Sequence, residues 1–580
     1  MVLTQVPDLS YLVLMWAFND IKMKNKTILH TALILLVGIV SACTKLDENA
    51  YDEIPSDKFY TNKNEVLSAV LRPYTHANAW VTPSGQDGWW RPAELSADQL
   101  AWPTKGPHGE DSGKWKRLHY HSWTVDEAGL NNAWSLIYGG IGYCNDPIAN
   151  ISTRDISTMG ITQKEKDEFI SELKLLRAFH YLKLMDLFGG VPIVTEPADP
   201  ANPVYPGTSS RKEVFDFVEK EIKDNINNVP KLSRAMLGRM SQASGYAMLV
   251  ELYLNAEVWS GTARWDDCIA AADKLINNEA GGQNGTMQLD TTITDQFKNT
   301  NDLSKEVIFS IAYDYTRAKF EPSWTGEFYH FAQKDIYGGG RNGNDGIVLI
   351  PGVYDTYEVD DRRKTEWLLI GPQYKFADTN TKTRAVLGTV EYQGLPLVFV
   401  DNIRKNKSGS TVSNMSEGEE NSGVRFNKYK LGNSVPGFVI NGKDTTAVQP
   451  DPNYNNTDWN VYRLTWIYFA KAEALMRKNG GVATAEAVAL INTTKKRAYA
   501  SAIRDAKAYT TATLTLDELL KERGREFIFE GFRRDDLIRF GKFTTGTWWD
   551  HTASSATKAL YPIPQRQRDL NPKLTQNPGY

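Results

Sequence analysis

The stretch SELKLLRAFHYLKLMDLFGGVP at residues 171–192 decides the fold class. Its apolar side chains recur at the three- and four-residue spacing of an α-helix and so share one broad face: Leu173, Leu176, Phe179, Leu184 and Leu187. Its charged side chains lie off this face. Gly189–Gly190 end the helix because glycine readily adopts the conformation that closes helices, and Pro192 prevents it from resuming. The pattern predicts an amphipathic helix from Ser171 to Phe188.

The amphipathic pattern recurs further along the chain. It covers five stretches: Arg211 to Val229, Gly238 to Val258, Trp265 to Asn277, Tyr462 to Arg477 and Ala485 to Arg497. Several alanines in them would let neighbouring helices approach closely, and such pairs are typical of tetratricopeptide-like stacks, although no strict repeat period survives here. The sequence therefore predicts a mainly α protein, a tetratricopeptide-like α-α superhelix of stacked helix pairs.

The composition changes between Leu289 and roughly Asn460, where helical periodicity fades and Gly, Asn, Asp and Thr increase. Glu306 to Ile311 and Leu395 to Val400 have the pattern of short buried strands. We expect a loop-rich inserted subdomain with short strands. Because loops on a rigid scaffold usually carry binding, this insertion and the loop-rich stretch 82–123 are the expected functional surface.

Composition and charge exclude several classes of protein. The chain has 580 residues, of which 41% are hydrophobic, so it can bury a large core. A net charge of -4 supplies no basic field for phosphates, so nucleic acid is not an expected partner. Cys144 and Cys268 lie in apolar helical patterns, and we expect small buried hydrophobic residues there rather than a disulfide or a reactive thiol.

The N-terminal segment has the pattern of a bacterial lipoprotein signal. Lys24 and Lys26 precede an apolar run from Ile28 to Val40, which is too short to span a bilayer comfortably. The quartet Val40-Ser41-Ala42-Cys43 then resembles a lipobox, in which the cysteine thiol is acylated and the chain is cut before it. We expect Cys43 to carry a lipid anchor to the membrane. The alternative is an ordinary cleaved signal with a coincidental cysteine.

Two flanking features refine this prediction. Residues 1–22 precede a second methionine, Met23, and have the pattern of an over-extended gene start. Lys45, Asp47 and Glu48 resemble the charged signal that sends some lipoproteins to the outer face of the outer membrane, which is the expected location.

The predicted organisation has five parts. They are a gene-start extension at 1–22, a lipoprotein signal peptide at 23–42, an N-terminal helical part at 43–288, a loop-rich insertion at 289–459 that forms much of the ligand face, and a C-terminal helical part at 460–580.

Four sets of residues carry a family resemblance. The first is Glu172, Leu176-Arg177-Ala178, Tyr181 and Phe188-Gly189-Gly190-Val191-Pro192; the second is Arg463-Leu464 with Ala472-Glu473-Ala474. The third is Arg525-Glu526-Phe527, Glu530-Gly531, Arg533-Arg534 and Asp536-Leu537 with Arg539-Phe540-Gly541; the fourth is the ending Tyr561-Pro562-Ile563-Pro564 and Gln576-Asn577-Pro578-Gly579-Tyr580. In order and spacing they resemble the signatures of the SusD/RagB family of outer-membrane nutrient-binding lipoproteins.

The resemblance implies a cell-surface protein that captures an oligo- or polysaccharide. Such a protein would close as a lid over a SusC-like, TonB-dependent transporter. No cofactor and no catalysis are implied. Fold resemblance does not identify the ligand.

A sugar-binding site has its own physical requirement, because a pyranose stacks its C–H face on an aromatic ring while polar side chains bind its hydroxyls. The stretch 98–105 fits, since Pro103 and Gly106 leave Trp102 in a loop. The resemblance gives Trp102 as a stacking residue and Lys105 as a polar contact, and Asp98 in the same stretch is a further expected polar contact. In the insertion the expected contacts are Trp324, Tyr329, Tyr337 and Arg341, and Gly346-Ile347 stands where a second platform tryptophan would be expected.

Two alternative functions remain open. Glu526 and Glu530, four apart on one expected helix face, could serve a surface glycoside hydrolase, although we expect Arg523, Arg525, Arg533 and Arg534 to pair with them and keep them ionised. The second alternative is a relative that binds peptides or glycopeptides. His119 and His121 share one face of an expected strand without a further ligand at zinc spacing, so no metal site is predicted.

Overall fold

The computed structural model describes residues 58–83, 87–199, 201–298, 300–314, 329–336, 343–376, 386–405, 410–429, 439–440, 443–444 and 457–580. Residues Tyr60–Tyr580 form one compact unit. The predicted signal peptide and Cys43 lie outside the described residues.

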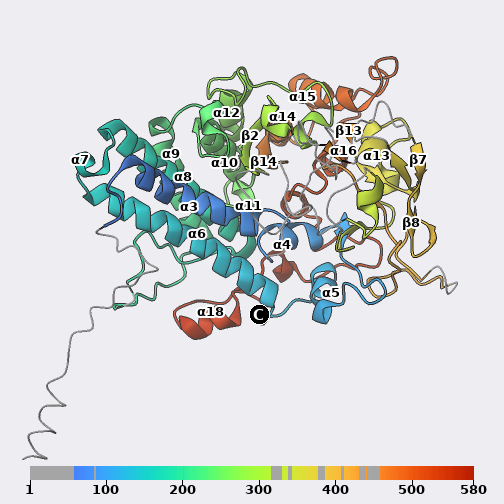
Figure 1. Cartoon of the computed structure of the whole chain (residues 1–580), viewed down its shortest axis with the longest axis horizontal. Coiled ribbons are helices and arrows are strands. Elements are labelled where there is room, and N and C mark those ends of the chain that lie inside the picture. The colour runs from blue at the N-terminus through green and yellow to red at the C-terminus, as the bar shows by residue number, and fades with distance from the viewer. Residues whose placement is uncertain are drawn as a thin grey trace, which may run out of the picture. The chain divides into compact units, whose positions relative to one another are not determined.

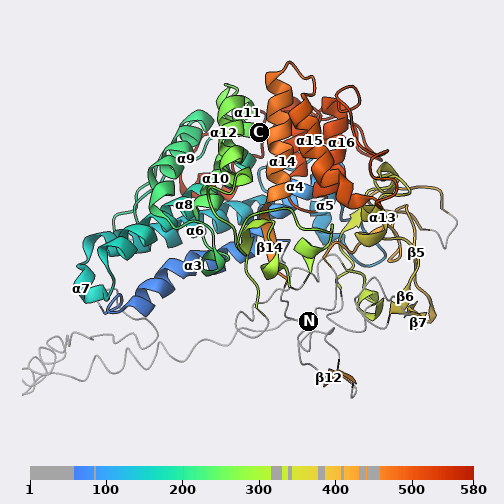
Figure 2. The same cartoon turned by 90° about the horizontal axis from the view of Figure 1, so that it is seen from above.

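A row of helices packed side by side confirms the mainly α fold class. In order of contact they are α3 (Lys63–Val81), α6 (Ala128–Thr153), α8 (Gln163–Phe188), α9 (Arg211–Asn225), α10 (Gln242–Leu254), α12 (Trp265–Ile276), α14 (Leu464–Lys478) and α15 (Ala485–Lys495). Each packs on the next, as Figures 1 and 2 show. This succession is the predicted α-α superhelix.

Eight further α-helices are described outside this row. They are α4 (Trp90–Leu95), α5 (Lys114–His119), α7 (Ile156–Met159), α11 (Ala256–Ser260), α13 (Arg362–Glu366), α16 (Leu516–Phe527), α17 (Arg533–Arg539) and α18 (Gln565–Leu570).

The N-terminal cap explains why α8 begins before the predicted Ser171. Thr162 and Glu165 form a capping box, in which each side chain accepts a hydrogen bond from the other residue's backbone N–H. The helix then ends at Phe188 as predicted, and Gly189 has a φ of 72°. The helix therefore extends back to its cap at Thr162, whereas the apolar pattern predicts only the part of the helix that is buried.

The insertion leaves the superhelix after α12 and returns before α14. Strand β2 (Val307–Ile311) pairs antiparallel with β14 (Trp459–Arg463), and β14 leads directly into α14. The ladder holds the two ends of the insertion together, so α14 packs on α12 as if the chain between them were absent. The predicted strand from Glu306 to Ile311 is confirmed.

The other described strands form short two-stranded pairs. These are β1 (Leu100–Ala101) with β3 (Val348–Leu349), β4 (Leu368–Leu369) with β11 (Arg425–Phe426), β5 (Gly371–Pro372) with β10 (Val398–Phe399), β6 (Tyr374–Phe376) with β7 (Val386–Thr389), β8 (Glu391–Tyr392) with β9 (Leu395–Pro396), and β12 (Val439–Ile440) with β13 (Lys443–Asp444). The prediction of one buried strand from Leu395 to Val400 was wrong. Both residues of β9 are exposed, and in β10 Val398 is exposed while Phe399 is buried, so the segment forms an exposed strand and a half-buried one.

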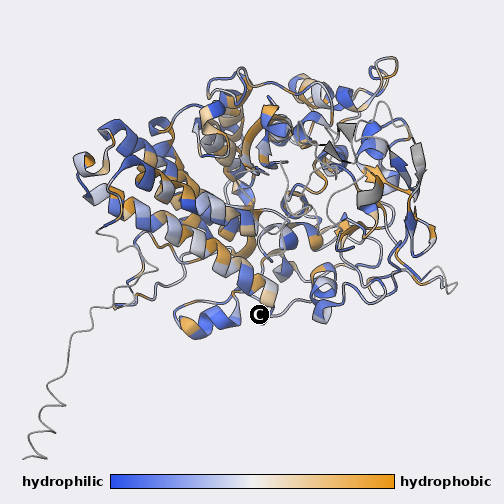
Figure 3. Cartoon of the chain, in the orientation of Figure 1, coloured by the Kyte–Doolittle hydropathy of each residue, from blue (hydrophilic) through white to orange (hydrophobic). Residues whose placement is uncertain are grey.

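One hydrophobic core runs through the helices and the insertion. In Figure 3 the apolar residues gather on the packed helices, whereas α18 is largely hydrophilic. Cys144 and Cys268 are free and buried in this core, as predicted. Among the described helices, none combines the length and the apolar character needed to cross a membrane.

The family signatures act as ties between distant segments. Glu172 on α8 accepts hydrogen bonds from Arg239 at 2.6 and 2.9 Å, and Arg177 pairs with Glu221 on α9. The C-terminal ending packs on the end of α8, where Asn577 Nδ2 donates to the Phe188 carbonyl at 2.8 Å. These motifs therefore hold distant segments of the chain together.

A buried ion network occupies the base of the insertion. Glu530 is bound by Arg463 Nε at 2.8 Å and by Lys428 Nζ at 2.5 Å, and Glu526 is bound by Arg463 and Arg363 at 3.0 Å each. Burial alone would raise the pKa of Glu530, but Arg463 and Lys428 hold it below its ordinary value. An ionised, paired carboxylate is a poor general acid, as expected.

Two details of the sequence prediction were wrong here. The helix α16 ends at Phe527, and Phe529 has a φ of 76°, so Glu526 and Glu530 do not share a helix face. The four expected arginines pair elsewhere: Arg523 with Asp536, Arg525 with Glu518 and Glu522, Arg533 with Asp98, and Arg534 with Asp186. The partners of Glu526 and Glu530 come instead from α13, β14 and the segment after β11.

The predicted strand around His119 and His121 was also wrong. Residues Lys114–His119 form α5, and His121 has a φ of 51° just beyond it. His119 bonds to Asp550 at 2.6 Å, and His121 packs on His551 with ring centroids 4.4 Å apart. Within the described residues, no group of three or more His, Cys, Asp and Glu side chains is arranged to hold a metal ion.

Candidate functional site

The loop 102–113 crosses from the helical scaffold to the insertion. Backbone bonds fix its start, since Leu100 pairs with Leu349 in the β1–β3 ladder and Thr104 N–H donates to the Met415 carbonyl at 2.8 Å. The predicted site residue Asp98 lies just before it and forms a two-bond ion pair with Arg533 at 2.6 and 2.8 Å. The structure thus brings the stretch 98–105 against the insertion, and Asp98 anchors it.

Trp102 lies in this loop but is only 8% exposed. Its ring stacks on Trp115 with centroids 4.5 Å apart and an interplanar angle of 4°, and the Arg91 guanidinium lies 5.2 Å from its centroid. A sugar ring could stack on Trp102 only if Trp115 or the loop moved. The stacked pair therefore supports the loop, and a glycan contact at Trp102 stays a prediction.

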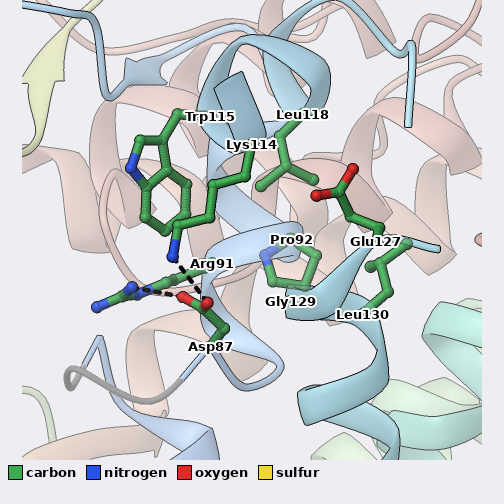
Figure 4. Close-up of a pocket in the computed structure, with 9 residues that line it drawn as sticks. All are labelled: Asp87, Arg91, Pro92, Lys114, Trp115, Leu118, Glu127, Gly129 and Leu130. Atoms are coloured by element: carbon green, nitrogen blue, oxygen red, sulfur yellow. Dashed lines mark hydrogen bonds and ion pairs between the residues drawn. The ribbon is translucent and has the colours of Figure 1, made fainter. Parts of the chain in front are cut away.

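A small pocket lies beside this pair (Figure 4). Asp87 bridges Arg91 at 2.5 Å and Lys114 at 2.9 Å across its mouth, with Trp115 and Leu130 among its apolar walls. The space open to water is about 20 Å³, which holds about one water molecule and is too small for a sugar ring. The pocket is part of the loop's support rather than a ligand site.

Lys105 is fully buried, in contrast to the expected ligand contact. Its Nζ donates to the Gly346 carbonyl at 2.6 Å, so it joins the loop to the segment where a second platform tryptophan was expected. Burial lowers the pKa of Lys105 to about 7, although Asp345 opposes the shift. Burial in turn raises the pKa of Asp345, which pairs with Arg425 at 2.6 Å. The geometry gives Lys105 a positioning role.

We predict that Lys105→Met changes stability in a pH-dependent way. The unfolded lysine keeps its ordinary pKa near 10.5 while the folded one titrates near 7, so between these values the unfolded state binds more protons. Wild-type stability should therefore rise relative to the variant as pH increases from about 7 to about 10. Urea unfolding of both proteins across this range measures the difference, and a difference that does not change with pH would contradict the placement of Lys105.

The remaining predicted site residues divide into two groups. Tyr329 is fully buried, and its hydroxyl donates to the Tyr429 carbonyl, so its ring belongs to the core. Trp324, Tyr337 and Arg341 lie outside the described residues.

An aromatic cluster that the sequence did not predict lies where the loop meets the insertion; it consists of His108, Phe331 and Tyr392. The rings of His108 and Phe331 meet edge to face with centroids 4.8 Å apart, and Phe331 stacks on Tyr392 at 6.1 Å with an interplanar angle of 22°. All three side chains are partly exposed. The aromatic cluster therefore offers solvent a ring surface assembled from three separate segments.

Polar groups line the rim of the aromatic cluster. Glu420 accepts a hydrogen bond from the Tyr392 hydroxyl at 2.5 Å and from Gln393 Nε2 at 3.1 Å, and it lies 3.4 Å from His108 Nε2. Burial and Glu420 raise the pKa of the Tyr392 hydroxyl, which therefore keeps its proton and its bond. Gln393 and Gly394 have φ values of 52° and 75° in the tight turn between β8 and β9, which presents Gln393 to solvent.

A buried histidine lies at the base of the aromatic cluster. His330 packs edge-on against Tyr392 with centroids 4.6 Å apart and is buried, and burial lowers its pKa to about 2, so the imidazole stays neutral. Partly exposed rings beside a carboxylate and an amide suit a ligand with apolar faces and a rim of hydroxyls. Of the nearby carboxyl groups, Asp345 is fully buried and cannot reach such a ligand.

Comparison with known proteins identifies the family. Residues 277–580 match the model of the SusD family, and residues 46–254 match a model described as "Starch-binding associating with outer membrane". The first match alone spans more than half of the chain. The chain belongs to the SusD family.

Curated members of the SusD family resemble the chain over most of its length. Starch-binding protein SusD of Bacteroides thetaiotaomicron is 25% identical over 452 residues, covering 73% of this chain and 75% of the relative. SusD-like protein P38 of Formosa agariphila is 24% identical over 430 residues, covering 71% of this chain and 74% of the relative.

Solved SusD-like structures have the same fold. A laminarin-binding SusD-like protein superposes with a TM-score of 0.64 at 20% identity, covering 90% of this chain and 100% of its own. Surface glycan-binding protein A from Bacteroides thetaiotaomicron superposes with a TM-score of 0.65 at 19% identity, with the same coverage of both chains.

Sequence reasoning selected the stretch 82–123 and the insertion, in which the aromatic cluster lies, but it did not predict the cluster itself. One local signal was available: the stretch EYQGLP at residues 391–396 has a Gln-Gly turn between short β-prone pairs and places Tyr392 beside the turn. Nothing local links it to His108 or Phe331, because their contacts join segments far apart in the chain.

Proposed function

We propose that the protein is a cell-surface lipoprotein that captures an oligo- or polysaccharide on its aromatic cluster. It delivers the glycan to a SusC-like TonB-dependent outer-membrane transporter and acts as its lid. A lipid on Cys43 holds it at the outer membrane, and tethering keeps the lid at high effective concentration near its transporter.

The observation that carries the proposal is the aromatic cluster with Gln393 and Glu420 at its rim. It combines stacking surface with fixed polar groups, which is what a pyranose ring requires. The names of the relatives point the same way, since they bind starch or laminarin, and surface glycan-binding protein A was solved with laminarihexaose. Glucose polymers are therefore the first ligands to test.

Binding without cleavage is part of the proposal. A glycoside hydrolase needs two carboxyl groups on either side of the scissile bond, one of them able to donate a proton. At the aromatic cluster, Glu420 is engaged by Tyr392 and Gln393. Glu526 and Glu530 are 2% and 3% exposed and are bound by cations, so a glycan cannot reach them.

A polysaccharide panel tests the function. The soluble chain from Thr44, which keeps every described residue, is run on native gels containing starch, laminarin or other polysaccharides. We expect at least one polysaccharide to retard it and no new reducing ends to appear on incubation. New reducing ends would support the hydrolase alternative. If none of the polysaccharides retards the protein and it binds a peptide or glycopeptide instead, the protein is a peptide- or glycopeptide-binding relative.

A further inference from the structure

A second concave surface lies on the helical side of the molecule, between α6, the connection from α8 to α9, and α18; we name it the α6–α18 groove. Water can fill about 420 Å³ of it, which is within the roughly 300–1,000 Å³ of small-molecule sites. None of its lining residues belongs to the aromatic cluster, and Figure 1 shows α18 well apart from β8.

The lining of the groove is uncharged and rich in rings. Among the described residues, no Asp, Glu, Lys, Arg or His lines it, whereas Trp134, Tyr138 and Tyr205 do. A charged ligand that lost water there would find no opposite charge, so the groove suits a neutral one. Tyr205 is 45% exposed, and its hydroxyl forms no hydrogen bond with the described part of the chain.

The groove is held in shape before any ligand arrives. Tyr205 precedes Pro206, which restricts its backbone to extended conformations. The Pro206 carbonyl accepts from Asn571 Nδ2 at 2.8 Å, and the Tyr138 hydroxyl donates to the Pro192 carbonyl at 2.7 Å. These bonds fix all three walls relative to one another, so binding would lose little conformational entropy.

The groove also offers fixed polar atoms to a hydroxyl-rich ligand. Gln567 Nε2 donates to Asn131 and Ser135 at 2.9 and 3.2 Å, which orients the amide. Within the described residues nothing donates to its Oε1, so this oxygen can accept from a ligand hydroxyl. Rings and a neutral amide acceptor again match the two surfaces of a sugar.

We propose that the α6–α18 groove is a second binding site, specific for a neutral oligosaccharide and separate from the aromatic cluster. It rests on the proposed function only for the choice of glucose oligomers as probes. A second site would hold a long polymer at two points and raise its overall affinity without a new contact at either.

Native mass spectrometry of the soluble chain from Thr44 with maltoheptaose or laminarihexaose tests this inference. With one of these probes we expect the wild type to bind a first and a second oligosaccharide. Tyr205→Ala should weaken one binding event about 30-fold or more and leave the other, because few aromatic residues dominate such sites. Tyr392→Ala should remove the other event. Tyr143→Ala, at a tyrosine that is 39% exposed on α6 outside the groove, should change neither.

The outcomes separate the two proposals. If binding is lost in Tyr392→Ala and unchanged in Tyr205→Ala, the groove inference is overturned and the proposed function stands. If Tyr205→Ala alone loses binding, the groove is correct and the aromatic cluster is not the site. No binding of either probe to the wild type overturns the groove as a glucose-oligomer site. Sedimentation of the same variants detects a different occupant, and a Tyr205-dependent dimer with unchanged glycan binding would also overturn the inference.

Discussion

Replacing Arg463 with methionine should lower the free energy of unfolding by about 3–5 kcal/mol, the typical cost of removing one partner from a buried ion pair. Arg463 is 1% exposed and binds three buried carboxylates: Glu530 at 2.8 Å, Glu306 at 2.9 Å and Glu526 at 3.0 Å. The variant would leave these negative charges in the core with one cation fewer. Arg463 also ends β14, so the damage falls where the insertion rejoins the superhelix.

Urea unfolding followed by circular dichroism measures this effect. Lys212→Met is the matched control, because Lys212 pairs with Asp216 at 2.6 Å but both side chains are more than half exposed, and such pairs contribute about 0–1 kcal/mol. In a double-mutant cycle with Glu530→Gln the two losses should not add, since the second change removes a carboxylate left unpaired by the first. A loss below about 1 kcal/mol for Arg463→Met would show that the network does not stabilise the fold as described.

The double variant Phe331→Ala/Tyr392→Ala should lose glycan affinity by about 30-fold or more. The two rings supply the stacking surface of the aromatic cluster, and residues of this kind cost at least about 2 kcal/mol each when truncated at a binding hot spot. Tyr392 also holds Glu420 at the rim, so its loss frees a polar group as well as a ring. Isothermal titration calorimetry with the glycan chosen by the panel measures the change.

Two further variants make this result specific. Tyr143→Ala removes an exposed ring on α6 and should leave affinity unchanged. Trp102→Ala tests the sequence prediction that Trp102 contacts the glycan. Because Trp102 stacks on Trp115, we expect this variant to lose less affinity than Phe331→Ala/Tyr392→Ala and to be less stable than the wild type. Full affinity in Phe331→Ala/Tyr392→Ala would remove the aromatic cluster from the binding site.

The helices could be predicted from sequence because their signals are local. The apolar spacing and the stop at Gly189–Gly190 lie within or directly after α8 and predict its end, and α9, α12, α14 and α15 begin within a few residues of the predicted starts. The error at His119 and His121 has a local cause as well. The prediction followed the two-residue spacing of His119 and His121, whereas the apolar Trp115 and Leu118 are three residues apart, which is the spacing of a helix face.

The site could be predicted only as a region. Trp102 and Lys105 have residue types suited to sugar binding, but their partners Trp115 and Gly346 bury them, and burial depends on tertiary contacts that local patterns do not contain. The same limit explains why Glu530 pairs with Lys428 and Arg463 rather than with the arginines beside it in sequence. Sequence patterns and the family resemblance predicted which loops would carry the site. Tertiary packing determines which side chains in those loops are exposed to solvent.

Hydrogen–deuterium exchange with and without the bound glycan tests the central claim most directly, because it locates the ligand on the unmodified chain. The account predicts slower exchange of backbone amides in the loop 102–113, in residues 329–336 and in the β8–β9 turn, and no shortening of the glycan during the measurement. Unchanged exchange in all three segments while the glycan is bound would contradict it.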